Sequence, residues 1–555
     1  MSTMPFHHYR PFAIIDRPCR AWPNKTITKA PIWCSVDLRD GNQALVEPMS
    51  VETKCRYFDL LVEMGFREIE VGFPAASDTE FDFIRKLIDE NRIPEDVTIQ
   101  VLTQAREHLI YRTFEAVMGA KRVIVHVYNS TSELQRRVVF GEGREGVTKI
   151  AVDAAQLIKD LAAKQSETDW VFQYSPESFT GTELGYALNI CDAVLDVWQP
   201  TPLKKVIINL PATVEMSTPN TYADMIEWMC QHIARRDSVI VSLHTHNDRG
   251  TGVAATELGL MAGADRVEGT LFGNGERTGN VDIITLAGNL MTQGMDPCLD
   301  FSDITRIVRI AEECTKLPVH ERHPYAGSLA FVALSGGHQD AIDKGLRALK
   351  IANAPYFECP YLTTNPPDIG RTYKGIVRIN SQSGKGGTRH VLEEEHGIRL
   401  PPDLLLDFSS VIQKVAASTG KEIFPEDLWH HFHTEYIDRR YPYDLIDYFD
   451  LPTKGGRQVT ATIEVRGVPK CITGIGNGVV HAFAEALREH CDVEMSILDL
   501  QEHAMKRGSD AFAIAYVPIH IPGREPIWGA GMSSDTTTAN LKAVLSAINR
   551  SFEST

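Results

Sequence analysis

The 555-residue chain lacks several features that mark specialised classes of protein. No apolar run approaches the length of a membrane-spanning helix, and the first stretch, MSTMPFHHYRPFAIIDRP, lacks the apolar core of a signal peptide. The ten cysteines include no CxxC pair and no dense framework, which fits a reducing compartment better than a disulfide scaffold. We therefore expect a cytoplasmic protein with no membrane partner.

Positive charge is also scarce. The formal net charge is −17 and the pI is near 5.6, which argues against a nucleic-acid partner, because such a partner selects a basic face. An anionic small substrate remains compatible if a local metal, arginine or lysine receives it. With 43% hydrophobic and 23% charged residues, the composition is that of a globular protein, and the length predicts more than one domain.

The first two-thirds of the chain alternates β-rich runs with amphipathic helical segments. Eight strands are predicted, at residues 32–40, 68–75, 98–103, 122–130, 170–178, 205–214, 239–248 and 266–275. Eight strand–helix units over roughly 290 residues match the count and length of a TIM (β/α)8 barrel. An open, doubly wound sheet is the alternative, but it usually has fewer strands and a phosphate loop after the first one. We predict the barrel.

Past about residue 320 this alternation ends. We predict an N-terminal arm (1–30), the barrel (31–325), a helical and irregular linker region (326–440) and a C-terminal α+β domain (441–555). The last domain contains a weak duplication, because VTATIEVRGVPKCITGIGNGVVHAFAEALRE and DAFAIAYVPIHIPGREPIWGAGMSSDTTTANLKAVLSAINR both read as strand, strand, glycine-rich turn and helix. Two such ββα-type units would form a regulatory domain with an effector pocket at their pseudo-dyad.

Polar side chains fall at the predicted strand ends, where TIM barrels collect their functional residues. They are Arg39, Asp40, His126, Ser175, Glu177, Thr213, His244 and His246, and Glu276 and Asn280 follow the eighth strand. We expect these side chains to converge on one mouth of the barrel.

The segment SLHTHNDRGTG predicts a metal site. His244 and His246 are two residues apart, so on a strand both imidazoles lie on the same face. Asp40, from a neighbouring strand, adds a carboxylate, and two imidazoles with one carboxylate form a facial set suited to a divalent metal. An isolated HxH is more often a satisfied polar strand end, but the shared location with Asp40 and Asn280 favours the metal.

The remaining candidates suit an anionic substrate. Arg39 beside Asp40 is placed to clamp a carboxylate in a bidentate manner, with a structural ion pair as the alternative. Thr213 and Ser175 are neutral donors for the same anion. Glu177 is either a base or an orienting group, and the sequence does not separate these roles. His338, in the glycine-flanked SGGHQDAIDKG, is by itself most simply a helix-capping side chain.

Two glycine-rich segments do not support a nucleotide site. GEGREG (141–146) follows a polar helical segment rather than a strand, and GNGERTG (273–279) lacks the GK[ST] ending of a phosphate loop. We interpret the second as a loop that shapes the mouth. Cys34, inside the first strand, is predicted to pack in the core rather than to act as a nucleophile.

DLRDGNQAL, HTHNDRGTG, GNGERTGN and SGGHQDAIDKG together resemble the signature segments of the 2-isopropylmalate synthases, a family of metal-dependent aldolase-like barrels. The resemblance extends from YRPF near the N-terminus, through RTYKGIVRINSQSGKGG, to GIGNG and TTTANLKAVLSAINR, so it covers nearly the whole chain. The HxH segment alone would indicate only the superfamily, and the C-terminal domain makes the resemblance specific.

This resemblance implies roles for individual residues. The implied metal ligands are Asp40, His244 and His246, with Asn280 close to the metal, and the implied 2-keto acid site comprises Arg39, His126, Ser175, Glu177 and Thr213. The family also delivers a histidine and a tyrosine to the active site of the neighbouring subunit of a homodimer. They correspond here to His338 and to Tyr361, and Tyr361 rests on the resemblance alone.

The implied reaction is a Claisen-type condensation of acetyl-CoA with 2-ketoisovalerate, followed by thioester hydrolysis, in leucine biosynthesis. The implied cofactor is Mg²⁺, Mn²⁺ or Zn²⁺, with a monovalent cation such as K⁺ as an additional candidate. Glu177 and His338 are the candidate bases for the acetyl methyl group. Three alternatives remain. The chain could synthesise homocitrate or citramalate from another 2-keto acid, or it could be a CoA-thioester lyase. It could also be an effector-binding protein whose barrel has lost catalytic activity.

The chain departs from the family in its C-terminal domain, where leucine acts as a feedback effector. The glycine-rich turn reads GNGVVHAF, with Val479 and His481, whereas the family usually continues with proline and an acidic residue. We therefore expect an effector pocket that is altered or tuned to another ligand.

Overall fold

The computed structural model describes residues 19–333, 335–352, 356–373, 392–393, 396–419, 425–505 and 512–552. The chain divides into a barrel unit, which runs up to Phe331 and includes Thr364–Thr372, and a C-terminal unit with Val332–Thr363 and the chain from Tyr373 onward. Residues 1–18 of the predicted N-terminal arm and 374–391 of the predicted linker lie outside the described residues. The finer division at residues 30, 325 and 440 remains a proposal.

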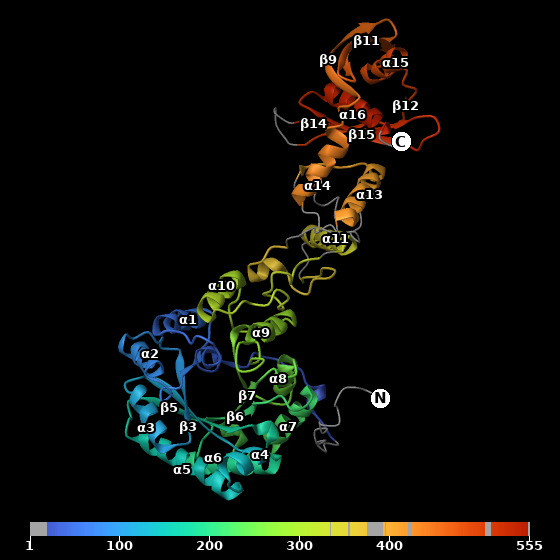
Figure 1. Ribbon diagram of the computed structural model, residues 1–555. Helices are drawn as coiled ribbons and strands as arrows, with labels where there is room; N and C mark the ends of the chain where they lie inside the picture. Colours follow the sequence, from blue (N-terminus) through green and yellow to red (C-terminus); the bar gives the residue numbers. More distant parts are fainter. Residues whose placement is uncertain are drawn as a thin grey trace. The chain divides into compact units, whose positions relative to one another are not determined.

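Eight parallel strands close into a barrel in sequence order, which confirms the predicted fold (Figure 1). The strands are β1 (Ile32–Ser35), β2 (Glu68–Gly72), β3 (Thr98–Gln104), β4 (Arg122–Ser130), β5 (Asp169–Glu177), β6 (Val206–Ala212), β7 (Val239–Thr245) and β8 (Arg266–Gly269). Parallel pairing places all their carboxyl ends on one rim, and this rim carries the candidate site.

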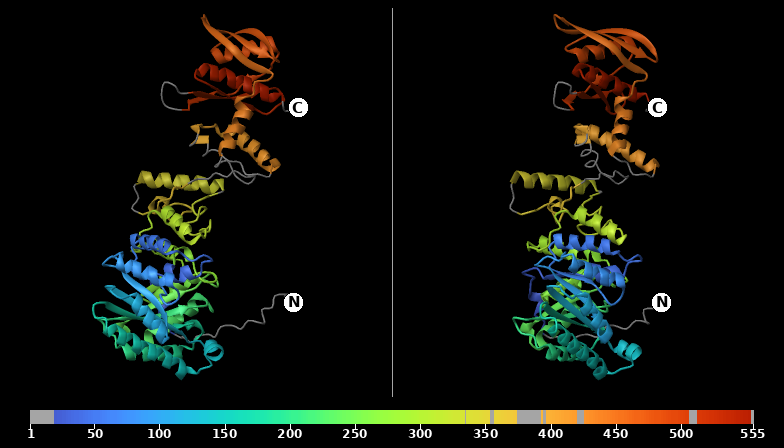
Figure 2. Two further views of the ribbon diagram at one scale, coloured as in Figure 1. Left: turned by 60° about the vertical axis from the view of Figure 1, so that its left-hand side comes forward. Right: turned by 90° about the vertical axis from the view of Figure 1, so that its left-hand side faces the viewer.

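Helices surround the strands of the barrel (Figures 1 and 2). They are α1 (Val51–Glu63), α2 (Asp78–Asp89), α3 (Glu107–Ala116), α4 (Glu133–Gln135), α5 (Arg144–Ala163), α6 (Leu184–Trp198), α7 (Pro219–His232), α8 (Gly252–Met261), α9 (Ile283–Thr292) and α10 (Ile304–Thr315). Short helical turns are η2 (Trp22–Asn24), η3 (Asp37–Gly41), η4 (Arg136–Phe140), η5 (Phe179–Gly181), η6 (Arg236–Ser238), η7 (Leu271–Gly273) and η8 (Pro366–Ile369). Within the described ranges, no helix is both long and apolar enough to span a membrane.

Polar side chains begin several of these helices. The hydroxyls of Ser50 and Ser77 accept hydrogen bonds from the backbone N–H three residues on, at the starts of α1 and α2. The Asp282 carboxylate accepts from the backbone N–H groups of Ile284 and Thr285 at the start of α9. Such caps satisfy N–H groups that the helix itself leaves without a partner.

The first strand is shorter than predicted. The run over 32–40 was predicted as one strand, which is wrong, because β1 ends at Ser35 and Asp37–Gly41 forms a π-helical turn. The buried carboxylate of Asp37 holds this turn: it accepts hydrogen bonds from Ser35 Oγ at 2.8 Å and from Tyr57 Oη at 3.0 Å. The polar residues predicted at the strand end therefore lie on a turn at the barrel mouth.

Five other strands also end earlier than predicted, β2 at Gly72 and β5, by a single residue, at Glu177. β6, β7 and β8 end at Ala212, Thr245 and Gly269. Thr213 and His246 therefore follow their strands directly. The backbone N–H of His246 still donates to the carbonyl of Ala212 at 3.2 Å, and His246 also forms an isolated bridge with Asn280.

The barrel interior is polar, whereas barrels of this kind are usually filled by branched apolar side chains. The apolar residues Ile69, Val71, Val101 and Val267 alternate with polar ones along β2, β3 and β8 and belong to the hydrophobic core. A buried charge costs several kcal/mol unless it is paired, so this interior depends on its own hydrogen bonds. Its fully buried polar residues include Glu70, Gln100, Gln173, Ser242, Arg266 and Glu268.

The C-terminal unit contains helices and two antiparallel sheets. One sheet has the strand order β11–β10–β9, and in the other β14 pairs with β12, β13 and β15. The helices are α11 (Gly336–Ala352), α13 (Pro402–Thr419), α14 (Pro425–Phe432), η9 (His433–Ile437), α15 (Val479–Cys491) and α16 (Thr536–Ser551). The strands are β9 (Tyr443–Thr453), β10 (Gly456–Val465), β11 (Val468–Gly476), β12 (Ser496–Ile497), β13 (Gln501–Ala504), β14 (Ala513–His520) and β15 (Ile527–Ser533).

The predicted duplication appears as two ββα repeats. α15 packs on β10 and β11, and α16 packs on β14 and β15 (Figure 2). Both repeats bring the helix very close to the sheet at a strand glycine: a Cβ on Gly474 would lie 2.4 Å from Ala482 O, and one on Gly531 would lie 2.2 Å from Ala539 O. Glycine is required at these positions because backbone atoms occupy the space of a side chain.

We expect Gly531→Ala to destabilise the C-terminal unit by about 1–3 kcal/mol, since the added methyl group forces α16 away from β15. Calorimetric melting of the full chain measures this loss. Gly455→Ala is the matched control, because nothing lies within 4 Å of a Cβ at that position. Equal melting of the two variants would contradict the close-packing account.

Candidate functional site

A cavity of about 330 Å³ opens at the carboxyl ends of the barrel strands. The structure brings nine of the ten side chains predicted at the strand ends to this cavity, on β4, β5 and β7 and on the turns that follow β1, β6, β7 and β8, whereas Asn280 is not part of the lining. Its lining residues are Arg39, Asp40, Gln43, Phe73, Leu102, His126, Tyr128, Ser175, Glu177, Thr213, His244, His246, Glu276 and Arg277.

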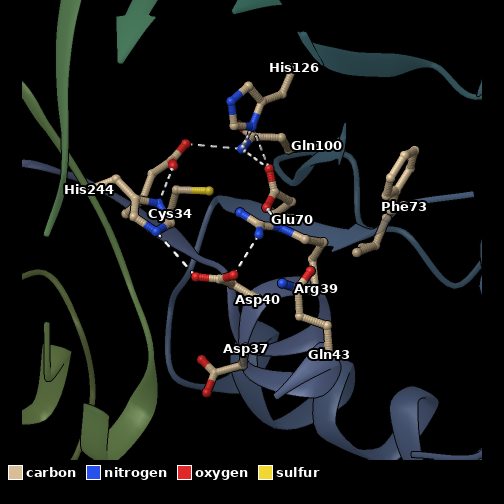
Figure 3. A network of polar contacts seen from close by, with 12 residues as sticks. Cys34, Asp37, Arg39, Asp40, Gln43, Glu70, Phe73, Gln100, His126 and His244 are labelled. Carbon is tan, nitrogen blue, oxygen red and sulfur yellow. Dashed lines mark hydrogen bonds and ion pairs between the residues drawn. The ribbon is translucent and has the colours of Figure 1, made fainter. Parts of the chain in front are cut away.

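Asp40, His244 and His246 form the candidate metal centre. One ligand atom from each lies within 4.8 Å of the other two, and all three residues are buried. Asp40 Oδ2 lies 3.2 Å from His244 Nε2 and 3.8 Å from His246 Nε2. Figure 3 shows the Asp40 carboxylate between the imidazole of His244 and the guanidinium of Arg39.

Two buried polar atoms beside this group have no hydrogen-bond partner among the described residues. They are Nδ1 of His246 and Oδ1 of Asn280, whose backbones pair in an isolated bridge. Buried polar atoms are rarely left without a partner, so these two fit a site completed by something other than protein. An amide oxygen, a carboxylate oxygen and two imidazole nitrogens are a donor set that divalent metals accept.

The electrostatics of the centre also favour a cation. Burial raises the pKa of Asp40, but the Arg39 guanidinium and His244 outweigh it and hold that pKa well below its usual range. Burial lowers the pKa of His244, yet hydrogen bonds to Asp40 and Glu268 raise it to about 9. Burial and the neighbouring His244 lower the pKa of His246 to about 4. The Asp40 carboxylate therefore stays ionised beside the two imidazoles and offers a negative charge to a cation.

Arg39 joins the candidate metal centre to a second buried group. Its Nη1 donates to Asp40 Oδ1 at 2.6 Å and its Nε donates to Glu70. Glu70 Oε2 lies 2.7 Å from Nδ1 of His126, whose Nε2 lies 2.7 Å from Ser175 Oγ. Predicted metal and substrate residues thus belong to one hydrogen-bonded chain (Figure 3).

Glu70, His126 and Glu268 also lie close enough together to hold an ion. Their oxygens, however, already accept hydrogen bonds from Arg39, from the amide of Gln100 and from other buried N–H groups. A cation in this position would meet those donors. We therefore interpret the group as an internal network and not as a second metal centre.

Glu177, on β5, and Thr213, directly after β6, also line the cavity. The Glu177 carboxylate accepts a hydrogen bond from Ser130 Oγ. Thr213 Oγ1 accepts from the backbone N–H of Ser178 at 2.9 Å, and Arg277 donates to the Thr213 carbonyl. Both predicted residues face the cavity, and both are held by the loops around it.

His338 and Tyr361 lie in the C-terminal unit and line no part of this cavity. Their rings stack on each other with centroids 4.0 Å apart. Tyr361 is 64% exposed and has a left-handed backbone with φ of 62°. Two residues that are 23 positions apart in the chain therefore form one exposed aromatic pair.

Several residues of the site were missed by the sequence analysis. Phe73, Leu102 and Tyr128 line the cavity, and Gln100 and Glu268 lie in the buried network. The sequence does contain a signal for Gln100 and Glu268, because each is a charged or amide residue within a short apolar strand, as in TIQVLT and RVEG. Cys34 is buried, as expected for a core residue.

Three family descriptions match consecutive parts of the chain. "HMGL-like" matches residues 30–310, "Alpha-isopropylmalate synthase, post-catalytic domain-like" matches residues 328–393, and "LeuA allosteric (dimerisation) domain" matches residues 422–552.

Curated relatives match over almost the full length. The 2-isopropylmalate synthase of Rhodospirillum rubrum is 55% identical over 553 residues, which is 99% of each chain. The 2-isopropylmalate synthase of Pseudomonas putida is 54% identical over 554 residues, covering 99% of this chain and 98% of its own. Among solved structures, the hydroxymethylglutaryl-CoA lyase of Pseudomonas aeruginosa aligns over 53% of this chain and 96% of its own, with 18% identity and a TM-score of 0.43.

The pKa of His244 gives the centre a pH dependence. Below pH 9 a metal must displace the proton on His244, so we expect affinity for Mn²⁺ to rise by about tenfold per pH unit between pH 7 and 9. His246, with a pKa of about 4, is already neutral in this range and adds no slope. Titration calorimetry in buffers of different ionisation enthalpy measures the protons released, and no release at pH 7.5 would contradict this assignment.

His244→Ala should abolish metal binding and lower kcat by more than about 100-fold, the upper end for loss of a residue that only supports a ligand. The fold should persist, because the residue lines an open mouth. His232→Ala, at the exposed end of α7, is the control. Activity near that of the unmodified chain would rule out the metal assignment.

Proposed function

Because the chain belongs to the 2-isopropylmalate synthase family, we propose that it condenses acetyl-CoA with 2-ketoisovalerate and hydrolyses the product thioester. The products are 2-isopropylmalate and CoA, and the enzyme is an acyltransferase of leucine biosynthesis. The observation that carries this proposal is the 55% identity to the Rhodospirillum rubrum enzyme over 99% of both chains. We place the reaction in the cytoplasm.

Asp40, His244, His246 and the amide oxygen of Asn280 are the residues proposed to hold a divalent cation, Mg²⁺, Mn²⁺ or Zn²⁺. When bound, such a cation supplies a Lewis acid for the keto oxygen and the carboxylate of the substrate. A monovalent cation such as K⁺ is proposed as an additional cofactor.

Arg39 and Thr213 are proposed to bind the carboxylate of the keto acid. Since Thr213 Oγ1 already accepts from Ser178 N–H, its own O–H is directed elsewhere and serves as a donor. Arg39 is held by Glu70 and Asp40 while it still lines the cavity, so its guanidinium is fixed before substrate arrives. Phe73 and Leu102, the apolar side chains of the cavity lining, suit the isopropyl group.

His126 and Ser175 complete the keto acid site. If Glu70 is ionised, His126 Nδ1–H donates to it, and His126 Nε2 then accepts the Ser175 O–H. Ser175 Oγ in turn accepts from the amide of Asn209 at 3.0 Å. Hydrogen bonds with Glu70 and Asn209 therefore fix the orientations of the His126 ring and of the Ser175 hydroxyl group at the cavity.

Condensation starts when a base takes a proton from the acetyl methyl group of acetyl-CoA, and Glu177 and His338 remain the two candidates. Glu177 lines the cavity with a carboxylate that one hydroxyl, Ser130, already holds. The methyl carbon then bonds to the keto carbon, and the resulting alkoxide takes up a proton. Water next adds to the thioester carbonyl, the C–S bond breaks, and CoA leaves as the thiol.

We propose that His338 and Tyr361 act in the active site of the neighbouring subunit of a homodimer. Their stacked, exposed rings form a pair suited to contact another chain. The match to an allosteric (dimerisation) domain over residues 422–552 supports the assembly.

Leucine is the proposed effector of the C-terminal domain, in a modified pocket. Residues Val479 and His481 replace the proline and acidic residue expected in its glycine-rich turn. His481 Nδ1 accepts a hydrogen bond from the backbone N–H of Asn477 at 3.1 Å, so this histidine stabilises the turn itself.

Thiol release with a panel of 2-keto acids tests the proposed reaction. We expect kcat/KM for 2-ketoisovalerate to exceed that for pyruvate by more than about 10-fold, because each missing methylene group loses apolar contact in the pocket. A preference for 2-ketoglutarate or pyruvate would instead indicate homocitrate or citramalate synthesis. Cleavage of hydroxymethylglutaryl-CoA without any condensation would establish the lyase.

Mixing two inactive chains tests the shared active site. Chains with His244→Ala and chains with His338→Ala, co-expressed, form mixed dimers in which one site combines the intact metal centre with the intact partner histidine. Random pairing should restore about a quarter of the unmodified activity. A mixture as inactive as its components would show that His338 acts within its own chain.

A further inference from the structure

Glu268 lies directly behind the candidate metal ligand His244. It is on β8, fully buried, and its Cα pairs in register with that of His244 on β7. Its Oε2 lies 2.8 Å from Nδ1 of His244, whose Nε2 in turn lies 3.2 Å from Asp40. The imidazole is therefore held between two carboxylates, one inside the barrel and one at the mouth.

The other oxygen of Glu268 is fully engaged by donors. Oε1 accepts hydrogen bonds from Arg266 Nη1 at 2.7 Å, Gln173 Nε2 at 2.7 Å and Gln100 Nε2 at 3.0 Å. Arginine has no acceptor to offer, so an oxygen is required at this position. Oε2 is then the atom that receives the Nδ1–H of His244.

We propose that Glu268 is a positioning residue that fixes the tautomer of His244, keeping the proton on Nδ1 and presenting Nε2 to the cation. This inference rests on the proposed metal site and adds a residue that carries no ligand atom. Carboxylates that accept the second N–H of a ligating histidine orient its ring and raise its basicity.

Gln100 extends this arrangement to the substrate side. Its amide nitrogen lies between Glu268 and Glu70, at 3.0 and 2.5 Å, and its oxygen accepts from Arg266 at 2.8 Å. Glu70 contacts Nδ1 of His126 as Glu268 contacts Nδ1 of His244. Two carboxylate–imidazole pairs, one for each half of the site, thus share one amide.

The geometry makes Glu268→Gln a specific probe. Arg266 demands that the amide oxygen of the new side chain take the place of Oε1, which leaves its NH₂ group facing His244 Nδ1. Nδ1 must then accept, so the proton moves to Nε2 and occupies the lone pair that the metal needs. For Nε2 to bind a metal, the proton would have to return to Nδ1, and this N–H group would then face the NH₂ group of the introduced amide.

The dissociation constant of Mn²⁺ from the full chain measures the effect of this substitution. The signal of the free ion in electron paramagnetic resonance monitors binding. We expect Glu268→Gln to raise the dissociation constant by about 10–100-fold, the range typical for such supporting partners. Glu268→Asp keeps a group that only accepts hydrogen bonds, so its dissociation constant for Mn²⁺ should be closer to that of the unmodified chain.

Glu68→Gln is the matched control. Glu68 Oε2 accepts from Nε of the same Arg266 at 2.5 Å, and within the part of the chain that the structure describes it forms no hydrogen bond or ion pair with His244. Its Mn²⁺ affinity should stay within about twofold of the unmodified chain. An equal loss in Glu68→Gln would mean that the barrel core as a whole, and not the tautomer, determines affinity.

Unchanged affinity in a folded Glu268→Gln chain would overturn the inference while leaving the metal site intact. Failure of the unmodified chain to bind Mn²⁺ would instead overturn the metal site. If Glu268→Gln does not fold, ¹⁵N-histidine spectra of the unmodified chain with Zn²⁺ decide, with the His244 signal assigned through His244→Ala. Nε2 ligation with a protonated Nδ1 supports the inference, and ligation through Nδ1 rejects it.

Discussion

Charges buried inside the barrel determine the rest of the site, because each is tolerable only beside its partner. Glu70 and Glu268 are fully buried, and they face the guanidinium groups of Arg39 and Arg266. An unpaired charge in this interior would cost several kcal/mol, so these ion pairs stabilise the observed arrangement of the side chains. This arrangement orients His126 and His244 at the mouth before any ligand arrives. It also leaves Asp40 beside the two imidazoles of His244 and His246.

The loops at the mouth are also held together by carboxylates that accept hydrogen bonds from neighbouring loops. The π-helical turn after β1 is held by Asp37, which also accepts from the backbone of Leu271 after β8, at 3.0 Å. Asp248 accepts from Arg277 Nε at 2.7 Å and from the Glu215 backbone N–H at 2.9 Å, which joins the loops after β6, β7 and β8. The cavity lining is therefore assembled from separate loops that hold one another.

The order of eight β-rich runs and the helical segments between them was sufficient to predict the barrel, because each run is recognisable from its own apolar residues. Polar residues at the strand ends predicted much of the mouth, since parallel closure brings those ends together. The first strand was extended too far because Asp37 meets Tyr57, a contact that no local pattern reveals. Glu268 was missed because its role depends on the register with His244, which exists only once the sheet closes.

The proposed function depends on a single cation bound by Asp40, His244 and His246. Anomalous diffraction from crystals of the full chain soaked with Mn²⁺ tests it most directly. We expect one strong peak within coordination distance of all three side chains and of the Asn280 amide oxygen. A peak at the deeper group of Glu70, His126 and Glu268, or no peak at the mouth, would contradict the account.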